Sequence, residues 1–115
     1  MSKLTNQKCA PCQIATSALA PNAITPLLGQ LRDWEVIDNH HLRKSWTFPD
    51  FRTALEFVNR VGEIAEREDH HPDIYFSWGK ARVELWTHKV DGLTENDFVV
   101  AAKFDESAAE QTRGG

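Results

Sequence analysis

Three histidines in this chain have the chemistry of proton transfer near neutral pH. His70 and His71 stand side by side directly before Pro72, and His88 follows further along the chain. Imidazole has an ordinary pKa of about 6.5, so it can give or accept a proton near pH 7. Glu66 lies four residues before His70, where a continuing helix would bring its carboxylate beside the imidazole. Residues of these types can carry out general acid and base catalysis when they are brought together.

Apolar periodicity and turn residues predict the elements that must position these side chains. The expected order is helix, two strands, helix, two strands, helix. The first helix is expected over Ile24–Leu31, and the second begins after the capping residue Asp50 and must stop before Pro72. Hairpins are expected at 34–38 with 41–48, and at 73–78 with 81–88 around a turn at Gly79-Lys80. Thr94 is expected to cap the last helix.

The second helix carries the clearest apolar stripe. Its predicted buried residues are Phe51, Leu55, Val58, Val61, Ile64 and Ala65. Hairpins pair antiparallel strands, so the predicted fold is α+β, a four-stranded antiparallel sheet with three helices packed on one face. The other face carries aromatic strand residues, which favours a homodimer.

The length of 115 residues predicts one domain. We expect a loosely structured N-terminal segment over residues 1–22, punctuated by prolines, and a folded domain over residues 23–111. Cys9 and Cys12 fall in the leading segment, and the favoured interpretation is an exposed pair, with a metal or redox role as the alternative.

Composition argues against several kinds of partner. The net charge is -4 and the pI about 5.7, so the chain lacks the basic field that attracts nucleic acid. No segment approaches the roughly 20 apolar residues of a membrane span, and no signal peptide pattern opens the chain. A cytoplasmic protein is therefore expected.

Strand geometry predicts that the histidines converge. In the last strand Val83, Leu85 and Thr87 share one face, while Trp86 and His88 share the other. Antiparallel pairing of the last two strands places His71 and His88 at the same end of their hairpin.

Simpler interpretations compete with a catalytic one. Adjacent histidines in a polar connection are often solvated, and His40-His41 shows how readily such a pair occurs. A zinc site from His70, His71 and His88 is the other alternative, but adjacent residues in an extended segment point apart. We therefore expect no metal.

The spacing of these residues resembles that of the pterin-4a-carbinolamine dehydratases. The family pattern is an acid, three residues, His-His-Pro, five or six residues, an aromatic, nine residues, a His and, about nine positions later, an Asp. Here these elements are Glu66, His70-His71-Pro72, Trp78, His88 and Asp97. The segment "THKVDGLTENDF" is also similar to the family, and the likeness covers about Ile24 to Phe104.

The resemblance implies the family's fold, activity and site. The fold is a four-stranded antiparallel sheet with three helices on one side, in homodimers or homotetramers. The reaction is dehydration of a 4a-hydroxytetrahydropterin to the quinonoid dihydropterin, with no metal and no cofactor, which recycles the pterin of aromatic amino acid hydroxylation. The implied catalytic residues are His70, His71, His88 and Glu66, with Glu66 orienting His70 or assisting the proton transfer. The implied border of the pterin is Asp69, His70, His71, Trp86, Thr87, His88 and Lys89.

Some residues and functions remain open on the sequence alone. Trp86 departs from the small residue of some members. Trp78 and Asp97 match the pattern, but each also has a structural interpretation, as an aromatic packing on the sheet and as a first-turn acid favoured by the helix dipole. The alternative function is that of a dimerisation cofactor of a transcription factor, which mammalian members also serve.

Overall fold

The computed structural model describes residues 17–114 and contains the helices and strands in the predicted order. In chain order they are α1 (Pro21–Leu28), β1 (Glu35–Ile37), β2 (His41–Thr47), α2 (Phe51–Glu68), β3 (Asp73–Ser77), β4 (Lys80–Leu85), the short 3-10 helix η3 (His88–Val90) and α3 (Glu95–Gly114). Cys9 and Cys12 lie outside the described residues, and the domain limits stay predictions. No helix of the described part is long and apolar enough to cross a membrane.

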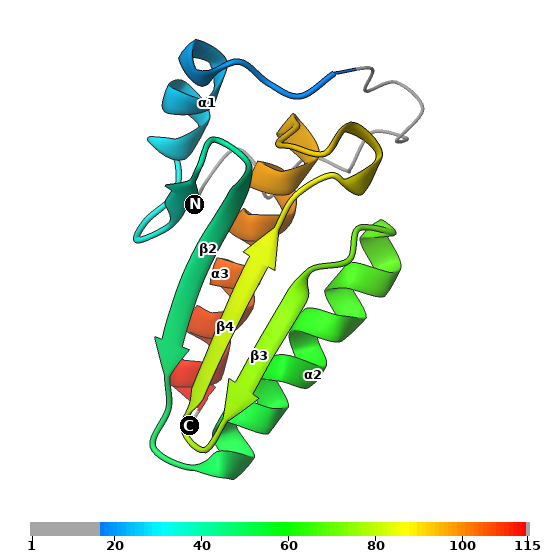
Figure 1. Cartoon of the computed structure of the whole chain (residues 1–115). Coiled ribbons are helices and arrows are strands. Elements are labelled where there is room, and N and C mark those ends of the chain that lie inside the picture. The colour runs from blue at the N-terminus through cyan, green and yellow to red at the C-terminus, as the bar shows by residue number, and fades with distance from the viewer. Residues whose placement is uncertain (1–16, 115) are drawn as a thin grey trace.

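The four strands form one antiparallel sheet in the order β1-β2-β4-β3. The last strand of the chain, β4, lies between β2 and β3, with Leu42 opposite Leu85 and Asp73 opposite Glu84. The start of β2, the end of β4 and the start of β3 therefore lie at the same end of the sheet (Figure 1).

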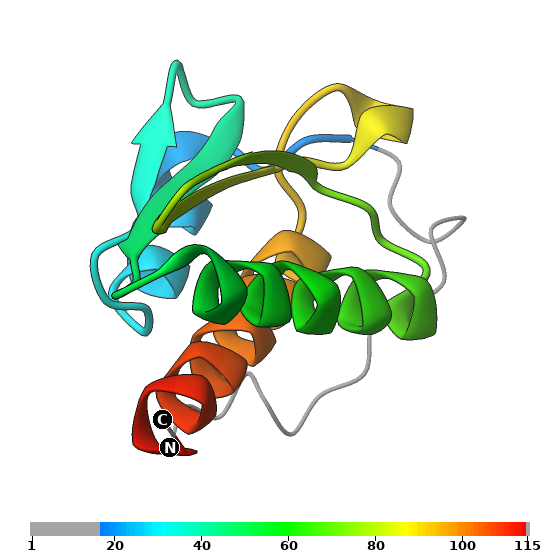
Figure 2. The same ribbon diagram turned by 90° about the horizontal axis from the view of Figure 1, so that it is seen from below.

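Helices α2 and α3 cover one face of the sheet and close a single core (Figure 2). Phe57 of α2, Phe98 and Phe104 of α3, and Val83 and Leu85 of β4 are fully buried in it. Helix α1 packs against α3 and adds Ile24 to the same core. The predicted α+β fold with helices packed on an antiparallel sheet is confirmed.

Helix α2 begins where the sequence predicts, but its buried face is turned. Asp50 caps it by accepting a hydrogen bond from the Thr53 backbone N–H at 2.8 Å, and this bond lowers the pKa of Asp50. The cap therefore stabilises the fold above the ordinary carboxyl pKa, and this stability is lost as the pH falls through the lowered value. Of the predicted stripe, Val61, Ile64 and Ala65 are buried as expected, whereas Phe51 and Leu55 are exposed and Phe57 is fully buried.

Two other predicted boundaries differ from the structure. The first helix begins at Pro21 and ends at Leu28, because proline is pre-organised for the first helical turn and Gly29 already ends the helix. The turn of the second hairpin is Trp78-Gly79, since Lys80 already pairs with Ser77. Gly79 has a φ of 67°. Tight hairpin turns use such positive φ values, which glycine adopts readily because it has no side chain.

The end of α2 directs the chain toward the sheet. Asp69 takes a left-handed conformation with φ 52°, which aspartate tolerates better than most residues. The next backbone N–H, that of His70, bonds back to the Ala65 carbonyl at 3.0 Å, as in a Schellman motif. The helix thus stops before Pro72, as predicted, and releases His70 toward the interior.

The turned face of α2 can be tested with two substitutions of the same residue type. We expect Phe57→Ala to lower the free energy of unfolding by about 3–5 kcal/mol, because it leaves a cavity under Trp46 and Phe48, whose rings lie 4.8 and 5.2 Å away. Phe51→Ala, at a position 47% exposed, should cost about 1 kcal/mol or less. Urea unfolding measures both, and equal losses would contradict this packing.

Candidate active site

A cleft of about 200 Å³ opens where the end of α2, the start of β3 and the end of β4 come together. Its lining consists of the residues that the family resemblance implies as the border of a pterin: Asp69, His70, His71, Trp86, Thr87, His88 and Lys89. The structure thus brings together the three histidines that the sequence places apart.

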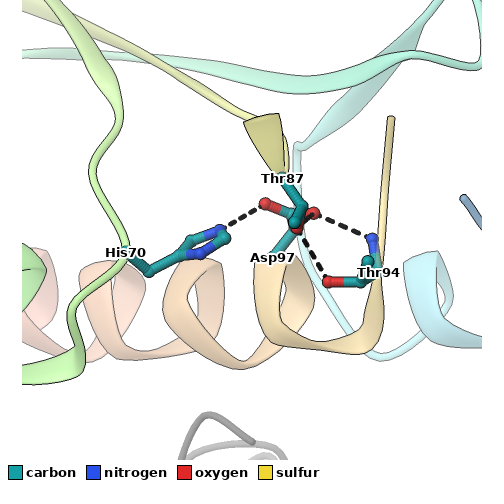
Figure 3. A network of polar contacts seen from close by, with 4 residues as sticks. All are labelled: His70, Thr87, Thr94 and Asp97. Atoms are coloured by element: carbon teal, nitrogen blue, oxygen red, sulfur yellow. Dashed lines mark hydrogen bonds and ion pairs between the residues drawn. The ribbon is translucent and has the colours of Figure 1, made fainter. Parts of the chain in front are cut away.

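A buried carboxylate, Asp97 of α3, bonds to two of the residues that line the cleft, His70 and Thr87 (Figure 3). Its Oδ1 accepts a hydrogen bond from His70 Nε2 at 2.5 Å. Its Oδ2 accepts from the Thr87 hydroxyl and from the Thr94 backbone N–H, both at 2.9 Å. Asp97 is fully buried and His70 is 6% exposed. Three segments of the chain, the end of α2, the end of β4 and the start of α3, therefore meet at one charge.

This network fixes the direction of each hydrogen bond. A carboxylate only accepts, so Thr87 donates to Asp97, and the Thr94 hydroxyl then donates to Thr87 across 2.8 Å. His70 must likewise carry its proton on Nε2, which leaves Nδ1 as the basic nitrogen of the neutral ring. The arrangement resembles the carboxylate that orients the histidine of a catalytic triad.

Glu66 orients a different histidine from the predicted one. Its carboxylate pairs with Nε2 of His71, and the expected contact with His70 is wrong. The four-residue spacing applies only within a helix, and α2 ends at Glu68, before His70 is reached. Both side chains of the Glu66–His71 pair are largely exposed at the edge of the cleft.

His88 stands at the opposite edge of the cleft. Strand β4 ends at Leu85, and His88 begins the 3-10 helix η3. The loop that contains η3 is closed by the hydrogen bond from the Thr87 N–H to the Gly92 carbonyl at 2.8 Å. The His88 ring stacks on Trp86, with centroids 4.5 Å apart and planes 7° apart. Trp86 therefore contributes its ring, and not only its backbone, to the site. The side chain of His88 is exposed and can reach a bound molecule.

Trp78 lies far from this cleft. It sits in the turn between β3 and β4, at the end of the hairpin opposite His71 and His88, and is 69% exposed. The interpretation that Trp78 packs on the sheet is therefore wrong for the single chain. Asp97 is a first-turn acid as expected, but its complete burial and its three hydrogen-bond donors give it a further structural task.

A larger groove of about 420 Å³ runs between α2 and α3. Charges of both signs line it, including Arg60, Glu63 and Arg67, and Glu68 pairs with Lys103 at 3.0 Å. No histidine lines this groove, so it lacks the proton-transfer groups of the smaller cleft. The chemistry of the side chains, rather than the size of the hollow, identifies the candidate active site.

Within residues 17–114, no group of three or more histidine, cysteine, aspartate or glutamate side chains is arranged to hold a metal ion. The sequence analysis did not identify Thr94 as part of the site, nor the bond between Asp97 and His70. The family spacing contains Asp97, but only the packing of α3 under the sheet brings it to His70.

Comparison with known proteins agrees with this geometry. A family model described as pterin 4 alpha carbinolamine dehydratase matches residues 17–107. The chain belongs to this family. A protein of Rubrobacter xylanophilus assigned by name to this dehydratase is 54% identical over 105 residues, which are 91% of this chain and 98% of the relative. One from Alkaliphilus metalliredigens is 45% identical and covers 96% of this chain and 100% of the relative.

Solved structures share the fold. A Brucella melitensis protein described as a transcriptional coactivator/pterin dehydratase is 31% identical, with a TM-score of 0.76 over 80% of this chain and 99% of that one. A pterin dehydratase-like protein, described as a RuBisCO assembly factor in the alpha-carboxysome, is 20% identical with a TM-score of 0.59, covering 67% of this chain and 90% of that one. The second likeness concerns the fold alone.

The role of Asp97 as a buried hydrogen-bond acceptor can be separated from its effect on the helix dipole. We expect Asp97→Ala to lower the free energy of unfolding by about 3 kcal/mol or more, because three buried donors lose their acceptor. Glu95→Ala removes an exposed acid from the same helical turn and should cost less than about 1 kcal/mol. Urea unfolding compares the two, and similar small losses would show that Asp97 acts only on the dipole.

Proposed function

We propose that this protein dehydrates a 4a-hydroxytetrahydropterin to the quinonoid dihydropterin at the histidine-lined cleft. The observation that carries the proposal is the convergence of three imidazoles on one cleft, one of them fixed by a buried carboxylate, in a member of the pterin 4 alpha carbinolamine dehydratase family. The enzyme is thus a hydro-lyase that regenerates a pterin used in hydroxylation.

The reaction needs one proton donor and one proton acceptor. The C4a–O bond breaks and the oxygen leaves as water after taking a proton, while the N5–H proton is removed and its electron pair forms the C4a=N5 double bond. The atoms and electrons balance without an oxidant or reductant, so side chains alone supply what the step requires. A positioned imidazole contributes about 10²- to 10⁴-fold in such a step.

The geometry favours a division of labour between the histidines. Asp97 holds the proton of His70 on Nε2, which suits His70 to act as the base through Nδ1. His88, exposed at the other edge, is then the acid at the leaving oxygen. His71, oriented by Glu66, holds the substrate, and Trp86 lines the cleft and supports His88 by stacking on it.

The alternative is a protein-binding role. The related Brucella melitensis protein is described as a transcriptional coactivator as well as a pterin dehydratase. Such a role would use the outer surface of the helices and would not need the cleft histidines. The oriented His70 and the stacked His88 therefore favour the dehydratase function for this chain.

We also propose that the protein forms a homodimer through β3, with homotetramers as pairs of dimers. This strand is an edge of the sheet, and an exposed edge is a template for pairing with a second chain. Its Tyr75 and Phe76 are exposed, 47% and 36% respectively. A second copy would cover these aromatic rings.

The catalytic assignment predicts large losses from two substitutions. We expect His70→Ala and His88→Ala each to lower kcat by about 10²-fold or more in the dehydration of freshly generated 4a-hydroxytetrahydropterin. Trp78→Ala is the control, because Trp78 matches the family spacing but lies at the far end of the hairpin. Near wild-type rates in both histidine variants, with folding intact, would refute the assignment.

The dimer proposal predicts a mass change. Light scattering of the protein as it elutes from a size-exclusion column should give the wild type a mass of two chains, or of four. Phe76→Glu should shift it toward the monomer, because a buried charge at a strand edge opposes pairing. A wild type that elutes at the mass of one chain would contradict the dimer.

A further inference from the structure

The histidine pair that looked incidental in the sequence, His40-His41, lies directly beside the cleft. The two rings contact Trp86, with centroids 5.3 Å and 5.9 Å from the indole. Trp86 is also the residue on which His88 stacks. The turn before β2 thus touches the wall of the candidate active site, because β2 and β4 are neighbours with Leu42 opposite Leu85.

A second contact ties the same turn to the loop that carries His88. His40 Nε2 donates a hydrogen bond to Oδ1 of Asp91 at 2.8 Å. His88 begins the short helix η3 and Asp91 is the residue that ends it. One end of this turn is therefore held by stacking on Trp86 and the other by His40.

A hydrogen bond joins the two rings of the pair. With its Nε2 proton directed at Asp91, neutral His40 accepts through Nδ1, so His41 Nδ1 donates to it across 3.1 Å. The other nitrogen of His41 faces Glu84 at 3.9 Å, and both of these side chains are largely buried. The left-handed residues Asp38 and Asn39 shape the turn that presents His40.

We propose that His40, through Trp86 and Asp91, is a positioning residue that holds His88 in its working orientation. This rests on the proposed function, in which His88 is the acid. His88 is exposed and lies on a three-residue turn, so on its own it would sample several orientations. A catalytic group displaced by about 1 Å can lose about 100-fold in rate.

Kinetics of single and double variants test the coupling. His40→Ala should lower kcat about tenfold with KM changed by less than about twofold, because the acid is misplaced while the cleft remains. In a His88→Ala background the same change should have no further effect on kcat. An unchanged kcat for His40→Ala, or an equal fold loss in both backgrounds, would overturn the proposal.

Two further variants separate positioning from general damage. Asp91→Asn keeps an oxygen acceptor and tolerates the left-handed φ of 50°, so it should retain most of kcat, whereas Asp91→Gly should resemble His40→Ala. Glu35→Ala is the matched control on the same hairpin, where Glu35 is exposed and faces Arg43. A loss for Glu35→Ala equal to that of His40→Ala would overturn the specific role of His40.

An NMR measurement that needs no substrate tests this proposal separately from the proposed function. Stacking on the indole places the ring protons of His88 in the ring current of Trp86, so their NMR signals should lie upfield. Trp86→Leu should abolish this shift and His40→Ala should reduce it. If the wild type does not dehydrate the pterin, the proposed function fails. The His88 signals still test whether His40 holds the orientation of His88. An unchanged His88 shift in His40→Ala would overturn it.

Discussion

The candidate site depends on one buried carboxylate. Asp97 has no access to solvent, and an unpaired charge there would cost several kcal/mol. Its two oxygens are satisfied by the His70 ring, the Thr87 hydroxyl and the Thr94 backbone. Folding of α3 under the sheet is therefore coupled to the placement of His70 and of the end of β4. The same bonds that stabilise the fold select the tautomer of a proposed catalytic group.

The site divides into a rigid floor and exposed edges. His70 and Thr87 are buried and belong to the network around Asp97, whereas His71 and His88 lie at the surface on either side of the cleft. Each exposed histidine has its own support, Glu66 for His71 and Trp86 for His88. The two exposed imidazoles are thus open to solvent while each contacts a neighbouring side chain. This is the organisation that catalysis by proton transfer requires.

Much of this could be predicted from the sequence, where local chemistry decides the structure. Alternation and turn residues predicted both hairpins, and antiparallel pairing placed His71 and His88 at one end. The pairing of β2 with β4, which brings His41 to Trp86, depends on packing across the whole core. The left-handed conformation of Asp69 likewise ends α2 before His70, so Glu66 pairs with His71 and not with the predicted partner His70. Phe57 lies four residues before Val61 and seven before Ile64, so helical periodicity is consistent with its burial. Only the position of the sheet decides that this side of α2, rather than the side of Leu55, is buried.

The most direct test of this account is the protonation of the His70 ring. Nitrogen-15 NMR of the neutral imidazole distinguishes a protonated nitrogen from a bare one. The structure predicts that the proton of His70 resides on Nε2, facing Asp97, and that Nδ1 is bare and available as a base. In Asp97→Ala this preference should be lost. A wild-type spectrum with the proton on Nδ1 of His70 would contradict both the buried network and the role of His70 as the base.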